Sequence, residues 1–145
     1  MIVWLCTDAS FREKSHVCGI GCQVLVDGKQ YQWSTYEKNV YTSQQAETLA
    51  LYYGIKRVMN EFGAKDTVLV IKSDNNSLVW RINELIDEIN DDLSLTNLEQ
   101  RIILMMRKFK MCGLAWCARE NNRCADNLAR QGIQKYFKEQ NKKRA

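Results

Sequence analysis

Residues 67–75 are TVLVIKSDN. The apolar run from Val68 to Ile71 is typical of a strand that lies inside a sheet and is buried on both faces. Ser73, Asp74 and Asn75 end the run with residue types that favour turns and helix caps. Helical patterns stand on both sides of this strand, so we expect it to pair in parallel after a right-handed crossover.

The same kind of pattern predicts the elements around this strand. Alternating apolar and aromatic residues indicate strands, and Asp27-Gly28 is a hairpin signal between two of them. Apolar residues at spacings of three and four indicate helices, the first of which has Thr42 or Ser43 as its N-cap. The expected elements are, in chain order, strands at 1–7, 17–26 and 30–38, a helix over 43–62, a strand at 67–71, helices over 78–89 and 95–109, a strand at 111–118 and a helix from 121 or 122 to 137.

The order βββαβααβα predicts one α/β domain, and a chain of 145 residues has room for one core. The first three strands form an antiparallel meander. The last two strands each follow a helix and extend the meander in parallel. The expected result is a five-stranded mixed sheet, with three antiparallel and two parallel strands and with helices on both faces.

The composition excludes several classes of protein. The chain has no proline and no window of 18 apolar residues, which excludes proline-rich linkers and a transmembrane helix. The start, MIVWLCTDAS, lacks the charged region and the length of a signal peptide, so we expect a cytoplasmic protein. The net charge of +4 is weak support for a nucleic-acid partner. Residues 135–145 carry all of this excess, so residues 1–134 are neutral.

Cysteine and tryptophan are both expected mainly in the core. Without a signal peptide, the six cysteines are expected to be reduced, packed thiols. A zinc site stays open as an alternative, although Cys18-x3-Cys22 and Cys112-x4-Cys117 lack the CxxC spacing of a zinc knuckle. The tryptophans expected in the core are Trp4, Trp80 and Trp116.

Four carboxylates stand at the boundaries of the expected elements. Asp8 ends the first strand, Glu47 lies in the first turns of the first helix, Asp74 ends the central strand and Asp126 starts the last helix. Ligands of open α/β sheets bind outside the carboxyl ends of strands, where Asp8 and Asp74 are expected. Each acid alone is also compatible with a turn or a cap. Glu47 shares a helix face with Ala50, and an inward carboxylate is costly unless it is protonated, paired or bound to a metal.

Five short motifs occur in order on these elements. They are Thr7-Asp8-Ala9-Ser10, Gly19-Ile20-Gly21, Gln45-Ala46-Glu47-x-x-Ala50-Leu51, Ser73-Asp74-Asn75 and Asn122-x-x-Ala125-Asp126-x-Leu128-Ala129-Arg130. Together with the order of strands and helices, the motifs resemble the ribonuclease H type 1 family, endonucleases that cleave RNA/DNA hybrids. The resemblance covers residues 2–137 and implies a ribonuclease H-like fold.

The resemblance also implies a mechanism, in which the RNA strand is hydrolysed to leave 5′-phosphate and 3′-hydroxyl ends. It implies two Mg²⁺ ions, or Mn²⁺, about 4 Å apart. Asp8 would bridge the ions, Asp126 would complete the site of the ion that activates water, and Glu47 and Asp74 would hold the ion beside the leaving oxygen. Mg²⁺ prefers oxygen ligands, and two divalent ions would offset the repulsion among four converging carboxylates.

Selection of RNA requires contacts to 2′-hydroxyl groups. By resemblance, the candidates for these contacts are Ser43, Gln44 and Asn76, all of which are also compatible with helix capping. Arg119 stands where some relatives have an arginine, so by resemblance it is a candidate to act on the phosphate or on the exchanging metal. It is also compatible with a plain surface arginine. The chain departs from many relatives because the loop before Asp126 has no histidine, the first hairpin is not rich in glycine and proline, and a basic insertion is missing.

Other functions are compatible with the same residues. They are another nuclease of this fold, such as a resolvase or an exonuclease, a non-catalytic nucleic-acid-binding domain, and a zinc-binding interaction module. The motif around Asp126, together with Gln44, favours hybrid cleavage. We expect a monomer that binds RNA/DNA hybrids and no membrane. Residues 1–137 are the expected catalytic domain, and residues 138–145 are an expected basic tail in which the last helix frays.

Overall fold

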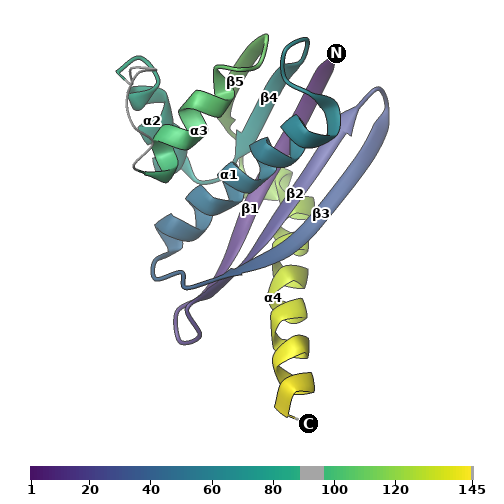
Figure 1. The fold of residues 1–145 in the computed structure, drawn as a ribbon, viewed down its shortest axis with the longest axis vertical. Coiled ribbons are helices and arrows are strands. Elements are labelled where there is room, and N and C mark those ends of the chain that lie inside the picture. The colour runs from purple at the N-terminus through teal and green to yellow at the C-terminus, as the bar shows by residue number, and fades with distance from the viewer. Residues whose placement is uncertain (89–96, 145) are drawn as a thin grey trace.

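A computed structural model describes residues 1–88 and 97–144. The strands are β1 (Ile2–Arg12), β2 (Val17–Val26), β3 (Lys29–Lys38), β4 (Val68–Ser73) and β5 (Met111–Trp116). The helices are α1 (Ser43–Phe62), α2 (Asn76–Leu85), α3 (Leu98–Met106), the short 3-10 helix η1 (Arg119–Asn121) and α4 (Arg123–Arg144). Helix α1 crosses one face of the sheet with α2 and α3 beside it, and α4 lies on the other face and extends beyond it (Figure 1). The expected mixed sheet with helices on both faces is therefore confirmed.

The sheet has the order β3-β2-β1-β4-β5. Strands β1 to β3 pair antiparallel, whereas β4 pairs in parallel with both β1 and β5. The turn between β2 and β3 is Asp27-Gly28, with φ values of 51° and 74°. Two positive φ values in a two-residue loop give the turn geometry whose twist suits a hairpin, as the sequence predicted.

Strand β1 is longer than expected. Its pairing with β4 ends at Thr7 opposite Ser73, but its pairing with β2 continues to Arg12 opposite Val17. Asp8 therefore lies inside β1, whereas the sequence suggested that it ends this strand. It is the first residue of β1 beyond the last partner in β4, so its side chain stands where the central pair of strands separates.

The main core lies between the sheet and α1, α2 and α3. Fully buried residues on this side come from alternate positions of the strands, as in Leu5 of β1 and Ile71 of β4. The other positions of β4 are only half-buried, so the expectation that this strand is buried on both faces is wrong. The reason is that α4 packs mainly on β1, β2 and β3 and leaves the outer face of β4 partly open.

Helix α4 approaches β2 unusually closely. A Cβ atom on Gly19 would lie 1.8 Å from the carbonyl oxygen of Ala129, and one on Gly21 would lie 2.1 Å from that of Ala125. The two glycines therefore let the helix backbone rest directly on the strand. This packing fixes the first turn of α4, which carries Asp126, at the same end of the sheet as Asp8.

Three tryptophans lie outside the core, so their expected burial is wrong. Trp4, Trp80 and Trp116 are 48%, 66% and 53% exposed. Trp80 is on the side of α2 opposite the buried Leu78, since two residues correspond to about 200° of helix rotation. Trp4 is a central-strand residue, but its side chain is on the sheet face that α4 covers only in part.

The carboxyl-terminal segment is helical up to Arg144, so the expected fraying is also wrong. Lys142, Lys143 and Arg144 occupy the last turn, where positive charge interacts favourably with the helix dipole. Two of the contacts between the helix and β3 lie in the second half of the helix: Lys135 donates to the carbonyl of Ser34 at 2.7 Å, and the hydroxyl of Tyr36 donates to Glu139.

All six cysteines are free, and of these Cys18 and Cys22 are buried and the other four half-buried. Within residues 1–88 and 97–144, no helix is long and apolar enough to cross a membrane. Ile89 and Leu95, which the sequence assigned to helix faces, lie outside the described residues.

Candidate active site

Asp8 is the most buried of the four acids, with 6% of its surface exposed. Its Oδ1 accepts a hydrogen bond from the backbone N–H of Ala9 at 2.9 Å. Because the carboxylate is held by its own strand, its position follows directly from the register of β1 in the sheet.

Glu47 approaches Asp8 from α1. Thr42 caps this helix by accepting from the N–H of Gln45 at 3.0 Å, so Glu47 lies just over one turn inside it. Its neighbours Ala46 and Thr48 are buried against the sheet. Among the described residues, the Oε2 atom of Glu47 is buried and has no hydrogen-bond partner. The carboxylate thus points inward, as the sequence predicted, and one of its oxygens is free to bind a ligand.

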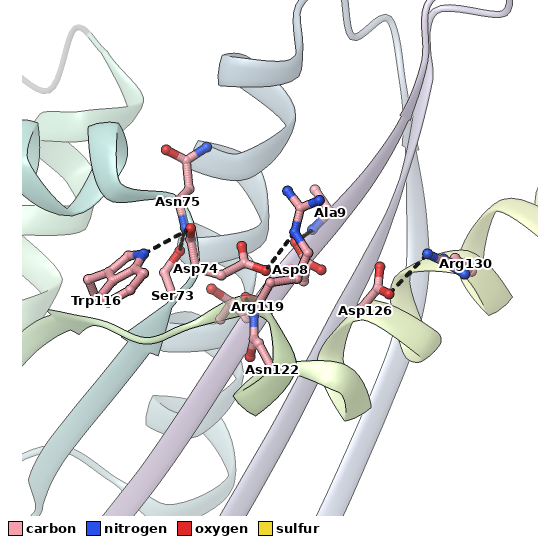
Figure 2. A network of polar contacts seen from close by, with 11 residues as sticks. Asp8, Ala9, Ser73, Asp74, Asn75, Trp116, Arg119, Asn122, Asp126 and Arg130 are labelled. Atoms are coloured by element: carbon pink, nitrogen blue, oxygen red, sulfur yellow. Dashed lines mark hydrogen bonds and ion pairs between the residues drawn. The ribbon is translucent and has the colours of Figure 1, made fainter.

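Asp74 follows β4 directly and precedes the N-cap of α2, which is Asn75. Its backbone carbonyl accepts from the indole Nε1 of Trp116 at 3.2 Å, which ties the ends of β4 and β5 together (Figure 2). Its Oδ2 lies 4.0 Å from the Nε of Arg119, whose side chain is 88% exposed. The backbone of Asp74 is therefore tied to β5, whereas the side chain of its cationic neighbour Arg119 is almost fully exposed to solvent.

Asp126 lies in the first turn of α4, on the other side of Asp8 from Asp74 (Figure 2). Its Oδ2 forms an ion pair with Arg130, one turn later, at 3.1 Å. The start of this helix is anchored by buried Asn122, whose Nδ2 donates to the carbonyl of Thr7 at 3.0 Å. That bond links the residue before α4 to the residue before Asp8, and so couples the positions of two of the acids.

The four acids line one cavity. Asp8, Glu47 and Asp74 each offer a carboxylate oxygen within 4.8 Å of the other two. The cavity has a volume of about 230 Å³, and Asp126, Arg119 and Arg130 also line it. Asp126 is thus in the same cavity but outside the close group of three. This volume exceeds the roughly 30 Å³ that one water occupies, so ions and several waters have room.

The acids disturb one another's ionisation. Burial, followed by the nearby charge of Asp74, raises the pKa of Asp8 to about 7. Burial, followed by the charge of Asp8, raises the pKa of Glu47 to about 9. A hydrogen bond between the two carboxyl groups lowers the pKa of Asp8 and raises that of Glu47. Without a counter-charge, the pair therefore retains a proton at neutral pH.

These features fit a divalent metal ion. The donors are all carboxylate oxygens, which Mg²⁺ and Mn²⁺ prefer. The unpartnered oxygen of Glu47 is a buried acceptor that a cation would satisfy. A cation would also replace the retained proton, because it stabilises the ionised form of every carboxylate around it. A group of like charges converging on one cavity is costly to the fold, and this cost is common at functional sites.

Of the four expected substrate contacts, Arg119 is the one among the residues that line this cavity. Gln44 is half-buried in the first turn of α1, and Ser43 beside it is exposed. Asn76 is exposed and begins α2, so the capping role belongs to Asn75, which accepts from the N–H of Leu78. Arg119 lines the cavity itself.

Sequence reasoning missed the contacts that three residues make. Arg130 belongs to a motif that was quoted for its resemblance, but its ion pair with Asp126 was not foreseen. Asn122 was expected at the start of the last helix, but its bond to Thr7, which links α4 to β1, was not foreseen. Arg81 of α2 was not considered at all, although it contacts the candidate Gln44. The only signal for Arg81 in the sequence was a positive charge a little over one turn after the start of its helix. Such charges are common on exposed helices.

Comparisons with known proteins agree with this architecture. The family model described as reverse transcriptase-like matches residues 6–132. A search of curated proteins found no match.

Solved structures show the same fold. Ribonuclease H1 from the archaeon Halobacterium salinarum NRC-1 has a TM-score of 0.73 at 19% identity, covering 93% of this chain and 99% of that one. LC11-RNase H1 in complex with an RNA/DNA hybrid has a TM-score of 0.73 at 20% identity, with the same coverages. The amino-terminal ribonuclease H domain of a Mycobacterium tuberculosis protein has a TM-score of 0.75 at 18% identity, covering 95% of this chain and 97% of that one.

Proposed function

Since this chain belongs to the reverse transcriptase-like family and has the ribonuclease H type 1 fold, we propose that it is a metal-dependent endoribonuclease that cleaves the RNA strand of RNA/DNA hybrids. The observation that carries the proposal is the convergence of Asp8, Glu47 and Asp74 within 4.8 Å of one another, with Asp126 lining the same cavity.

The four acids would hold the metal. By resemblance to the family, Asp8 would contribute to the binding of both ions, Asp126 to that of the ion that activates water, and Glu47 and Asp74 to that of the ion beside the leaving 3′-oxygen. When bound, two Mg²⁺ or Mn²⁺ ions supply an activated water and stabilise the charge on the leaving oxygen. We expect the products to carry 5′-phosphate and 3′-hydroxyl ends.

The residues of the chain orient this chemistry. The bond from Asn122 to Thr7 keeps Asp126 and Asp8 on a common frame, so the two acids are positioned before substrate arrives. Arg130 neutralises the outer oxygen of Asp126. Arg119 is exposed beside Asp74, where its guanidinium could contact a phosphate of the substrate.

Recognition of RNA is assigned to the surface next to the acids. Ser43 and Gln44 in the first turn of α1, with Asn76 at the start of α2, are proposed to contact 2′-hydroxyl groups across the minor groove. LC11-RNase H1, which shares the fold, has been solved with an RNA/DNA hybrid, and this supports a hybrid as the substrate class here. We propose that the protein acts as a cytoplasmic monomer, with residues 1–137 as its catalytic domain and residues 138–145 as a basic extension.

We expect the purified chain to cut an end-labelled RNA/DNA hybrid in Mg²⁺ or Mn²⁺ and to be inactive in EDTA. Duplex RNA and duplex DNA of the same sequence serve as matched substrates and should stay intact. Cleavage of duplex DNA would instead indicate another nuclease of this fold. Binding without cleavage in either metal would indicate a non-catalytic nucleic-acid-binding domain.

A further inference from the structure

A second cavity, of about 400 Å³, is lined in part by Gln44, which lies about one turn before Glu47 in α1. The first turns of α1 and α3 line it, and Arg81 reaches into it from α2. Arg81 is 30% exposed in its side chain, and its Nε lies 2.7 Å from Oε1 of Glu99 at the start of α3. This ion pair places the guanidinium at the wall of the cavity, next to the start of α3.

The other nitrogens of Arg81 reach Gln44. The orientation of the Gln44 amide is assigned from hydrogen bonding. Only with the amide oxygen toward Arg81 do the oxygen and the NH₂ group of Gln44 both face suitable partners. In this orientation the amide oxygen accepts from Nη2 at 2.5 Å and from Nη1 at 3.0 Å. A fork of two donors on one oxygen leaves the amide little freedom to rotate.

This contact decides what Gln44 can offer to a ligand. A glutamine amide has one acceptor oxygen and one NH₂ group with two donors. Because Arg81 occupies the oxygen, an incoming molecule can use only the NH₂ group, whose two N–H donors can serve a ligand beside a contact within the protein. In the minor groove of a hybrid, 2′-hydroxyl oxygens and the base atoms N3 and O2 are acceptors that such a donor can reach.

We propose that Arg81 is a positioning residue that fixes Gln44 as a hydrogen-bond donor toward the minor groove of the substrate. The inference rests on the proposed function and adds a determinant of substrate recognition outside the four acids. Glu99 completes the arrangement, since it pairs with Nε of the guanidinium while the two Nη atoms contact Gln44.

A double-mutant cycle of Arg81→Met and Gln44→Ala tests the proposal. Binding of the hybrid is measured in an Asp74→Asn background, where cleavage is expected to be lost, and KM and kcat are measured without that change. Loss of a hydrogen bond to a charged group corresponds to roughly tenfold, so Arg81→Met should weaken binding and raise KM by about that factor while kcat changes little. In the Gln44→Ala background the same change should have an effect below about twofold, because the two residues act as one unit.

Two further variants separate positioning from other roles. Arg81→Lys keeps the charge but lacks the pair of Nη donors that contact the Gln44 oxygen. This variant should therefore bind the hybrid as weakly as Arg81→Met does. Arg101→Met removes an equal charge from exposed α3 and should bind as the parent does. Rescue by lysine, or a salt dependence reduced by about one phosphate contact, would show that Arg81 contacts the backbone directly and overturn the proposal.

The outcomes distinguish this inference from the proposed function. If the parent protein neither binds nor cleaves the hybrid, the proposed function fails. If it does both and the effects of Arg81→Met and Gln44→Ala are additive, only the positioning role fails. A fall in melting temperature without a change in KM would assign Arg81 a purely structural role and also contradict the inference.

Discussion

Asp74→Asn is expected to abolish cleavage of the hybrid while the protein stays folded. The substitution is nearly isosteric and removes one charge from the group of three carboxylates. Loss of an outer-sphere partner of a metal typically costs 10- to 100-fold, so loss of a ligand should reduce kcat by more than about 100-fold. The measurement is single-turnover cleavage in saturating Mg²⁺. Cleavage at the parental rate would mean that Asp74 is not part of the site.

The same variant should make the metal-free protein more stable. The pKa of Asp8 is raised by burial and by Asp74, and that of Glu47 by burial and by Asp8, so the folded state binds more protons than the unfolded state. Stability of the metal-free parent should therefore fall as pH rises from about 4 toward 9. Removing the Asp74 charge should recover on the order of 1 kcal/mol at pH 8. Urea unfolding in EDTA measures this difference, and Mg²⁺ should stabilise only the parent.

Gly21→Ala is expected to separate α4 from the sheet. The added Cβ would lie 2.1 Å from the carbonyl of Ala125 and 2.5 Å from the N–H nitrogen of Ala129. Backbone atoms of a packed helix cannot shift on their own to make room. The substitution should therefore lower the free energy of unfolding by on the order of 3 kcal/mol, the upper end for overpacked cores. Activity should fall as well, since Ala125 precedes Asp126. Denaturant unfolding and hybrid cleavage below the melting temperature measure the two effects.

Gly113→Ala is the matched control for this substitution. Gly113 also lies in a strand, β5, but a Cβ built there meets no atom of the described residues within 4 Å. Alanine should be neutral or slightly stabilising there, since it reduces the entropy of the unfolded chain. Equal stability of the two variants would mean that α4 does not rest on β2 as described.

The fold was predictable because its local signals agree with one another. Helical periodicity on either side of the run from Val68 to Ile71 was enough to predict the parallel pairing. Asp27-Gly28 predicted the hairpin because the turn requires positive φ values, which these two residue types tolerate. The close contact between α4 and β2 was harder to foresee, because glycines such as Gly19 and Gly21 do not indicate which element packs against them.

The expectations that were wrong depended on which surfaces the helices cover. Trp4 lies in a central strand and Val70 in an apolar run, yet neither is fully buried, because α4 covers only part of its face of the sheet. The residue pattern of one strand does not show how much of the sheet face the helices on that side cover. Fraying after residue 137 was wrong because contacts with β3, such as that of Lys135 with Ser34, support the long helix α4.

The four acids of the candidate site could be predicted to lie together, but their geometry could not. The sequence brought four acids to one end of the sheet, and the structure places all four around one cavity. It could not show that Asp126 stands apart from the group of three and is paired with Arg130. It also gave no signal for the contact between Arg81 and Gln44, because that contact joins two helices whose side-chain directions depend on packing.

The ends of the cleaved RNA test the central claim most directly. A hybrid with an internally labelled RNA strand is incubated with the protein in Mg²⁺, and the fragments are analysed for their terminal groups. Hydrolysis at metal ions held by Asp8, Glu47, Asp74 and Asp126 predicts 5′-phosphate and 3′-hydroxyl ends, no cleavage in EDTA and none by Asp74→Asn. Fragments ending in 2′,3′-cyclic phosphate, or cleavage that persists in EDTA, would contradict it.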